Sequence, residues 1–337
     1  MPRKRQSIVP LQQTASSTIS RAFDPHFVTG SHFIIFLFIL RKPCLKVGVR
    51  EIDIGQFVFL CYNTLMEQID TLKNGYKIIQ DTESFMFGID AVLLADFVRF
   101  DGNGNNSGIK RNDKIIDLCT GNGIIPLILS GFFFANCFTG LEIQKESAEL
   151  AARSVELNNL QDKIRIINGD LKRLEDFTAV YGLAKHGFEV VTCNPPYSVV
   201  ESGKQNPKEP KAIARHELLC RLEDVVAAAD FLLKPHGKLF MIHRPYRLAE
   251  IFGALYAHQL EPKRMRLVSP FAGEEPNMVL IEARKNAKPR LKIEPELVVY
   301  EKCEDPVENT ARGNATSKNT RQYTRQVLEI YGRQTRC

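Results

Sequence analysis

Hydrophobic and polar positions alternate in a regular pattern from residue 66 onward. Short apolar runs typical of buried strands alternate with segments whose apolar residues recur at helical spacing. The predicted strands are residues 114–118, 138–143, 163–170, 188–193 and 237–243. The predicted helices are residues 89–100, with Asp90 as the N-cap, 124–133, 145–160 and 222–233. This order predicts an α/β fold with a doubly wound, mostly parallel sheet.

The C-terminal third departs from strict alternation. Two apolar segments, 264–270 and 278–285, are joined by the polar sequence FAGEEPN with no helix between them. They predict an antiparallel hairpin at the C-terminal edge of the sheet. Residues 303–322 are polar and predict a disordered insertion, and residues 323–337 predict a short C-terminal helix and tail.

The first 65 residues lack this pattern. They begin basic and rich in Ser and Thr, have no acidic residue before Asp24, and contain the apolar octet FIIFLFIL at 33–40. They could be a signal or transit peptide, a small extra element, or upstream sequence that is not normally translated. The octet lies late and no small-residue cleavage pattern follows it, which weakens the first interpretation. Met66 would serve as a natural start, so we expect residues 1–65 to lie outside a domain formed by 66–302.

Composition narrows the class of protein. The chain has 337 residues, is 44% apolar and carries a net charge of +6, which is compatible with a polyanionic partner. Its eight cysteines include no C-x-x-C pair, so we expect free thiols in a reducing compartment and no metal site. No apolar run approaches the roughly 18 residues that a membrane span needs. A cytoplasmic protein without a membrane anchor is expected.

One motif follows the first predicted strand of the sheet. IIDLCTGNGIIP places Asp117, Gly121 and Gly123 where an open α/β sheet binds its ligand. The dinucleotide-binding fingerprint requires a third glycine at position 126, where Pro126 stands. A nicotinamide or flavin cofactor is therefore disfavoured.

A second motif follows the fourth predicted strand. The apolar run that ends in Cys193 leads directly into Asn194, Pro195, Pro196 and Tyr197. Proline lacks a backbone donor and forces the preceding residue into extended geometry, so the strand stops and Asn194 is held extended. By itself this could be a rigid turn and nothing more.

Together the two motifs resemble those of a known family. D-x-C-x-G-x-G resembles motif I of class I S-adenosylmethionine (SAM) methyltransferases, and NPPY resembles the [DNS]-P-P-[YFW] motif of methyltransferases that act on planar amino groups. The segments FMFGIDAVLLADF, KAIARHE and EPNMVLIEARK are similar to those of the tRNA1(Val) (adenine-37-N6)-methyltransferase family. The resemblance covers residues 66 to about 300 and again 323–332. The insertion at 303–322 departs from it.

The resemblance implies a SAM site at the ends of the first three strands. Glu142 would hold the ribose hydroxyls and Asp170 the adenine amino group, although Glu142 could be an exposed strand-end glutamate and Asp170 a helix cap. Gly88 and Asp90 would face the methionine end of SAM, although helix entry also explains them. The full implied cofactor set is Gly88, Asp90, Asp117, Cys119, Thr120, Gly121, Gly123, Glu142, Ile143, Asp170, Leu171 and Asn194.

The NPPY resemblance implies the catalytic residues Asn194, Pro195 and Tyr197. The side-chain oxygen of Asn194 and the carbonyl of Pro195 would accept the two hydrogens of an exocyclic amine, and Tyr197 would stack on the extruded base. The substrate site would also include Pro196 and the cationic loop that follows. The cations of that loop, which could equally be solvated, are Lys204, Lys208, Lys211 and Arg215.

The implied activity is N6-methylation of adenine 37 in a valine tRNA, with tRNA as the partner of a monomer or weak dimer. A release-factor glutamine methyltransferase is an alternative, but residues 1–65 lack the amphipathic pattern of its helical N-terminal domain. A ribosomal RNA guanine-N2 methyltransferase and an RNA-binding protein without catalysis stay open. A DNA methyltransferase would add a target-recognition domain, and no such block is found in the sequence.

Overall fold

The computed structural model describes two strands near the N-terminus, most of residues 67–302 and the segment 322–332. Within 67–302 the residues outside the description are 82–86, 102–104, 106, 134, 136 and 197–219. The chain divides into two compact units, Met1–Met66 and Glu67–Cys337. In the first unit, β1 (Cys44–Val47) and β2 (Arg50–Asp53) form an antiparallel pair.

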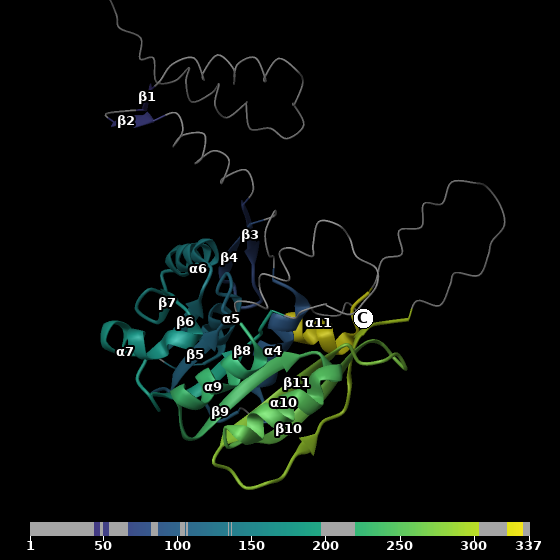
Figure 1. The fold of residues 1–337 in the computed structure, drawn as a ribbon. Coiled ribbons are helices and arrows are strands. Elements are labelled where there is room, and N and C mark those ends of the chain that lie inside the picture. Colours follow the sequence, from purple (N-terminus) through teal and green to yellow (C-terminus); the bar gives the residue numbers. More distant parts are fainter. Residues whose placement is uncertain are drawn as a thin grey trace, which may run out of the picture. The chain divides into compact units, whose positions relative to one another are not determined.

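A nine-stranded sheet forms the centre of the second unit (Figure 1). Its parallel strands lie in the order β9-β8-β5-β6-β7, so β5 has β8 on one side and β6 on the other. Their bounds are β5 (Lys114–Leu118), β6 (Cys137–Glu142), β7 (Ile164–Asn168), β8 (Phe188–Cys193) and β9 (Leu233–His243). The predicted doubly wound, mostly parallel sheet is confirmed. Its strand order reverses at β5, the point where such sheets bind ligands.

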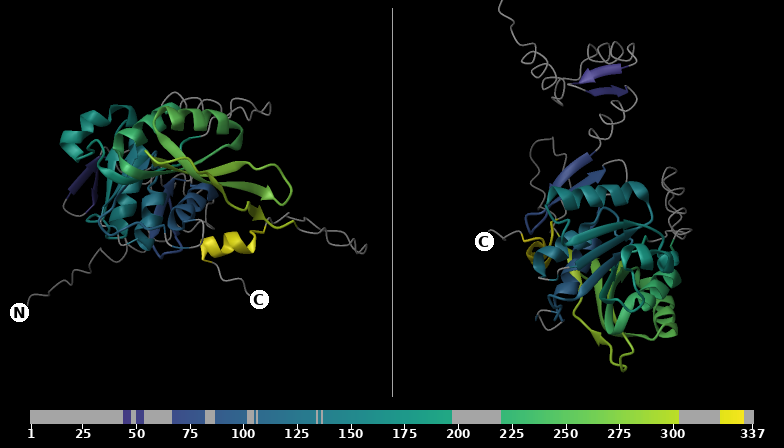
Figure 2. Two further views of the ribbon diagram at one scale, coloured as in Figure 1. Left: turned by 90° about the horizontal axis from the view of Figure 1, so that it is seen from below. Right: turned by 90° about the vertical axis from the view of Figure 1, so that its left-hand side faces the viewer.

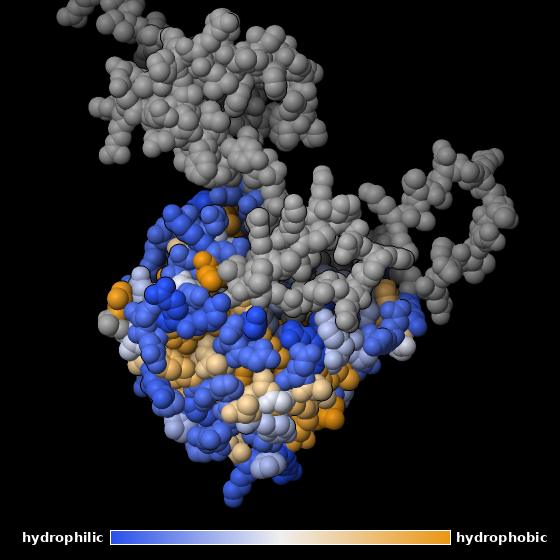
Figure 3. Space-filling view, viewed as in Figure 1, coloured by the Kyte–Doolittle hydropathy of each residue, from blue (hydrophilic) through white to orange (hydrophobic). Residues whose placement is uncertain are grey.

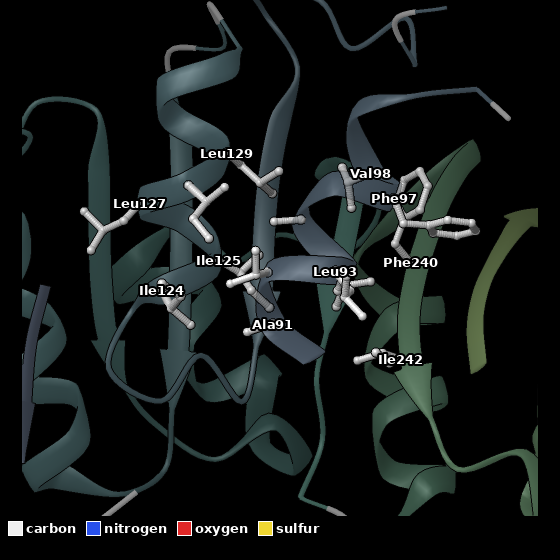
Figure 4. Close-up of a cluster of buried hydrophobic side chains, with 14 of the residues drawn as sticks. Ala91, Leu93, Phe97, Val98, Ile124, Ile125, Leu127, Leu129, Phe240 and Ile242 are labelled. Carbon is white, nitrogen blue, oxygen red and sulfur yellow. The ribbon is translucent and has the colours of Figure 1, made fainter. Parts of the chain in front are cut away.

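The strands are apolar throughout because both faces of the sheet are covered. Successive side chains of a strand point to opposite faces, so neighbouring residues enter different cores. Three such pairs divide between the two core clusters: Ile115 and Ile116, Val190 and Val191, Phe240 and Met241. Figure 4 shows part of the first cluster, in which side chains from α4 and α5 meet those of β9.

Helices cover each face of the sheet (Figure 2). Residues of α4 (Ile89–Arg99), α5 (Ile124–Phe132) and α6 (Lys145–Leu157) belong to the first cluster. Residues of the short helix η1 (Leu171–Arg173), α7 (Leu174–Tyr181), α9 (Leu222–Leu232) and α10 (Leu248–Ala257) belong to the second. The C-terminal helix α11 (Arg325–Tyr331) lies within the predicted segment and joins the first cluster through Val327.

The predicted C-terminal antiparallel hairpin is also confirmed. β10 (Leu260–Phe271) pairs antiparallel with β11 (Met278–Lys285), and β11 pairs antiparallel with β9. Beyond the hairpin, β12 (Lys292–Ile293) and β13 (Leu297–Tyr300) pair in parallel with β10. The sheet therefore ends in short strands that limit exposed pairing edges.

The second unit begins with a hairpin of its own. β3 (Glu67–Thr71) pairs antiparallel with β4 (Lys77–Asp81). Glu67 forms an ion pair with Arg153 of α6 at 2.6 Å, and the turn residue Asn74 donates to the carbonyl of Leu127 in α5 at 3.0 Å. These contacts fasten the first residues after Met66 to the helices of the first core.

The start of α4 differs from the sequence prediction. Gly88 is the N-cap residue, and Asp90, the predicted cap, lies in the first turn and accepts from the backbone N–H of Ala91 at 3.0 Å. A Cβ at position 88 would lie 2.6 Å from the Asp90 carboxylate. A larger residue at position 88 would therefore displace the Asp90 carboxylate from the helix entry.

Helix α10 lies on the outside of the second face. It buries only Ile251 and Leu255, and in Figure 3 apolar side chains gather over the region that α10 occupies in Figure 1. The two large side chains near its ends, Tyr246 and Tyr256, are 72% and 58% exposed. None of the helices that the structure describes is both long and apolar enough to span a membrane.

A chain that starts at Met66 should fold with a melting temperature within about 2 °C of the full chain. The second unit has its own cores and anchors its first hairpin internally, and the shorter chain keeps every residue of the two described core clusters. Thermal unfolding of the two chains, followed by circular dichroism, tests this. A loss of many degrees in the shorter chain would show that residues 1–65 belong to the domain.

Candidate active site

The end of β5 carries a buried carboxylate. Asp117 is 2% exposed and is the register partner of Thr192 in β8, so the two side chains leave the sheet on the same face. The Thr192 hydroxyl donates to Asp117 Oδ1 at 2.6 Å, and Asp117 Oδ2 has no hydrogen-bond partner among the described residues. Burial raises the pKa of Asp117 to about 7, although the hydrogen bond from Thr192 acts in the opposite direction.

The loop after β5 turns sharply with three residues in the left-handed region. Cys119, Gly121 and Gly123 have φ values of 56°, 57° and 84°. Gly123 begins α5, and a Cβ there would lie 3.1 Å from the Cβ of Ala151 in α6. The two glycines therefore let the backbone turn tightly between helices, and the N-terminus of α5, which has no side-chain cap, opens at this end of the sheet.

Glu142, at the end of β6, holds this loop. It is 5% exposed, Oε2 accepts from the backbone N–H of Gly121 at 2.9 Å, and Oε1 accepts from the backbone N–H of Gln144 at 2.9 Å. The alternative of an exposed strand-end glutamate is therefore excluded. A carboxylate accepts up to about four hydrogen bonds, so these two are compatible with further ones from a ligand.

The end of β7 supplies Asp170. Its Oδ1 accepts from the backbone N–H of Lys172 at 2.9 Å, so it caps η1, as the alternative interpretation of this residue expected. Asp170 is half-buried, which leaves contact with a ligand open to it, and the neighbouring Leu171 is buried. Ile143, which follows Glu142, is half-buried.

Asn194 lies one residue beyond the end of β8. The last register pair of β5 and β8 is Leu118 with Cys193, so Asn194 is level with Cys119 and the start of the glycine loop. Asn194 and Pro196 are half-buried and Pro195 is buried. Tyr197, Lys204, Lys208, Lys211 and Arg215 lie outside the described residues, and their expected roles stay predictions.

Gly88 and Asp90 lie at the same end of the sheet. Ala91, in the first turn of α4, joins a core cluster with Ile124 and Ile125, which begin α5, and with Ile242 near the end of β9 (Figure 4). The sequence-predicted residues on β5, β6, β7, β8 and α4 are thus gathered around one edge of the sheet.

Sequence reasoning missed a cluster of thiols at this edge. Cys119 Sγ lies 3.7 Å from Cys220 Sγ, and Cys193 ends the neighbouring strand. Hydrogen bonds within the cluster, together with burial, raise the pKa values of Cys119 and Cys220, and burial raises the pKa of Cys193. Neutral thiols here fill apolar space beside the loop. The part of the chain that the structure describes contains no group of three potential metal-ligating side chains.

Thr192 was also missed. It lies two positions before Asn194, and a period of two in a strand would place both side chains on the same face, which is the only signal for it in the sequence. Gly140 was missed as well: a Cβ there would lie 2.9 Å from the side chain of Thr120, so the glycine lets Thr120 pack closely on β6.

The fold is that of the class I methyltransferases. A solved structure described as a "predicted O-methyltransferase", from Agrobacterium tumefaciens, shares the fold with a TM-score of 0.52 and 24% identity, covering 72% of this chain and 96% of that one. A family model described as RNA methyltransferase matches residues 93–227.

Relatives found by sequence identify the family to which the chain belongs. The tRNA1(Val) (adenine(37)-N6)-methyltransferase of Porphyromonas gingivalis is 30% identical over 211 residues, 62% of this chain and 78% of that protein. The protein of the same name from Flavobacterium psychrophilum is 28% identical over 53% of this chain and 70% of its own length. The chain belongs to the tRNA1(Val) (adenine(37)-N6)-methyltransferase family.

The pKa of Asp117 predicts a pH-dependent stability. A carboxyl group whose pKa is higher in the folded protein than the usual 3.8 stabilises the fold when protonated, and this contribution is lost as the pH rises towards about 7. The ligand-free protein should therefore lose stability relative to Asp117→Asn between pH 4 and pH 7, by up to about 4 kcal/mol. Asparagine keeps an oxygen that can accept from Thr192.

Urea unfolding at several pH values measures this difference. Asp162→Asn, at an exposed position, is the matched control and should follow the wild-type curve. Parallel curves for wild type and Asp117→Asn would contradict the raised pKa.

Proposed function

We propose that this protein transfers a methyl group from SAM to N6 of adenine 37 in a valine tRNA. Family membership supports the reaction, and the single observation that carries it is the position of Asn194. The amide stands one residue beyond β8, level with the loop that follows β5, because the two strands pair in parallel up to Leu118 and Cys193. A base at Asn194 and a cofactor on the loop would then be neighbours.

The residues at the edge of the sheet fit SAM. Glu142 is buried with its carboxylate fixed by two backbone N–H groups, which suits a pair of ribose hydroxyls. Gly121 and Gly123 allow close approach of a ligand to the backbone, and Asp117 supplies a carboxyl group with one unsatisfied oxygen. Asp170 would accept from the adenine amino group. When bound, SAM supplies a methyl group on a positively charged sulfur.

The chain's own residues would prepare the nucleophile. The lone pair of an exocyclic amine is spread into the ring, so the nitrogen attacks poorly while it is planar. The Asn194 side-chain oxygen and the Pro195 carbonyl accept the two N–H groups, which favours a tetrahedral nitrogen whose lone pair points at the methyl group. No strong general base is required in this mechanism. Stacking of the base on Tyr197 would offset part of the cost of extruding it.

The proposed setting is the cytoplasm, with tRNA as the partner of a monomer or weak dimer. The net charge of +6 suits a polyanionic partner without defining which one. Release-factor glutamine and ribosomal RNA guanine are the competing substrates, because both present planar nitrogen to the same motif. No described contact favours either of them over adenine.

Glu142→Ala should weaken SAM binding by about 10- to 100-fold, since a hydrogen bond to a charged group contributes about 1.5 to 3 kcal/mol. The substitution also removes the anchor of Gly121, so affinity alone does not separate the two roles. Calorimetry with S-adenosylhomocysteine and with its 2′-deoxy analogue separates ribose binding from anchoring of the loop. Wild type should bind S-adenosylhomocysteine, which has both ribose hydroxyls, more tightly than the 2′-deoxy analogue, and the variant should bind the two equally. If the variant loses affinity equally for both ligands, Glu142 anchors the loop and does not bind ribose.

Asn194→Ala should lower the single-turnover methylation rate of unmodified tRNA1(Val) severely while RNA and SAM affinities stay close to wild type. Its contacts strengthen only as the nitrogen becomes tetrahedral. Tyr197→Ala should instead weaken capture of the base, and Tyr197→Phe should keep most activity because stacking needs the ring alone.

Release factor serves as the comparison substrate, and nucleoside analysis of the product identifies the methylated atom. Transfer to release factor but not to tRNA would reject the proposed function. A normal rate in Asn194→Ala would reject the role of the amide.

A further inference from the structure

The segment after β9 reaches the same edge of the sheet as Asn194. β9 pairs in parallel with β8, the last register pair being Cys193 with Met241, and it continues to His243. Arg244 and the short helix η2 (Pro245–Arg247) follow at once. Because β8 and β9 are neighbours, this segment forms the rim of the site on the side of Asn194.

Tyr246 stands out on this rim. It is 72% exposed, the highest value among the large apolar and aromatic side chains of the described residues. Pro245 occupies the start of η2 and fixes the backbone there. An aromatic side chain loses favourable burial when it faces water, so a rigidly placed, exposed ring beside a candidate site is typical of a binding surface.

Arg244 and Arg247 flank Tyr246 in the sequence. Arg244 Nη1 donates to the carbonyl of Asn277 at 2.9 Å, and Arg247 forms an ion pair with Glu250 at 2.7 Å. The contact to Asn277 orients the Arg244 guanidinium, which has five N–H donors. Arg244 stands directly between the end of β9 and η2, so it is part of the same rim segment as Tyr246.

His243 adds no charge to this segment at neutral pH. Burial and the two arginines lower its pKa to about 4. Its Nδ1 accepts from the backbone N–H of Arg244 at 2.8 Å, which fixes the chain at the point where it leaves the sheet. At another point of this edge, η1 presents the exposed Lys172.

We propose that Tyr246 is a stacking platform for an unpaired base next to the methylated adenine, and that Arg244 binds the phosphate beside that base. This inference rests on the proposed function. An adenine that enters the site leaves its stack, and its neighbour in the RNA loses a partner. An exposed ring at the rim replaces that partner, and a guanidinium next to the ring meets the backbone between the two nucleotides.

The chemistry of the rim favours RNA over a protein partner. Tyr246 follows the strand next to Asn194, where the RNA substrate of the proposed function would lie, and the chain carries Arg244 two positions before it and Arg247 directly after it. Aromatic and arginine residues in one short segment suit the joint binding of bases and phosphates.

Tyr256 provides a matched control. It is 58% exposed, belongs to α10, the helix that follows η2, and lies ten positions after Tyr246. The chain then enters β10, whose first residue, Leu260, pairs with Lys285 at the opposite end of the sheet from the register pair of His243 and Val279. The two tyrosines therefore match in type and exposure and differ in distance from the site.

The test measures affinity for an unmodified tRNA1(Val) transcript by fluorescence anisotropy, with SAM affinity measured by calorimetry beside it. Tyr246→Ala should weaken transcript binding by about 5- to 150-fold, the range that loss of one stacked base gives. Tyr246→Phe and Tyr256→Ala should bind the transcript like wild type, and all three variants should bind SAM normally. Arg244→Ala should reduce the slope of log affinity against log salt by about 0.7, as expected for one single-strand phosphate.

The outcomes separate this inference from the proposed function. If wild type methylates the transcript and Tyr246→Ala binds it equally well, the platform is wrong and the function stands. If Tyr256→Ala weakens binding as much as Tyr246→Ala, the effect does not belong to the rim and the platform is again wrong. If wild type neither binds nor methylates tRNA, the proposed function fails and the platform fails with it.

Discussion

The parallel pairing of β5 with β8 is the constraint on which the site depends. Each strand ends in a motif, and parallel pairing brings the two strand ends to one edge of the sheet. The hydrogen bond from Thr192 to Asp117 joins the next-to-last residues of the two strands. It therefore fixes the register of β5 against β8 at the point where the loops begin. A slip of one residue would turn Asp117 and Thr192 to the other face and separate Asn194 from the glycine loop. Burial on both faces makes such a slip costly, because Ile115 and Ile116 fill different cores.

The same burial explains how much of the fold could be predicted from sequence. Residues 114–118 and 188–193 are strands with the predicted bounds, since each is an apolar run closed by a turn signal.

Prediction was poorer where local signals conflict with tertiary pairing. β9 begins at Leu233, four residues before the predicted start, because pairing with β8 overrides the proline and glycine at 235 and 237. Helix α10 was not predicted: it buries only two residues, so its apolar period is weak. Gly88 displaced Asp90 as the cap of α4 because the aspartate side chain folds back against the helix entry.

The sequence predicted which residues lie at the site better than it predicted which atoms those residues contact. Motif spacing brought Asp117, Glu142, Asp170 and Asn194 to one edge, and the strand order gathers them there. What Glu142 touches depends on how the loop after β5 folds over β6, which the three left-handed residues determine. The spacing of the motifs does not predict the backbone course of this loop. Thr192, Gly140 and the contact between Cys119 and Cys220 were missed for the same reason, since each joins segments whose register is known only in the folded chain.

Asp117 and Glu142 lie at the ends of neighbouring strands, so their negative charges would repel each other if both were ionised. The fold gives the two carboxyl groups different surroundings. Glu142 receives two backbone N–H groups, which stabilise negative charge, whereas Asp117 is buried with one hydroxyl donor on Oδ1 and an unsatisfied Oδ2. The charge of Glu142 adds to burial in raising the pKa of Asp117 to about 7. Around pH 7, Asp117 is therefore partly protonated. A cationic ligand would reverse this balance, because a positive charge nearby favours ionised Asp117 and would release its proton. The negative charge of the site therefore increases when a cationic ligand binds.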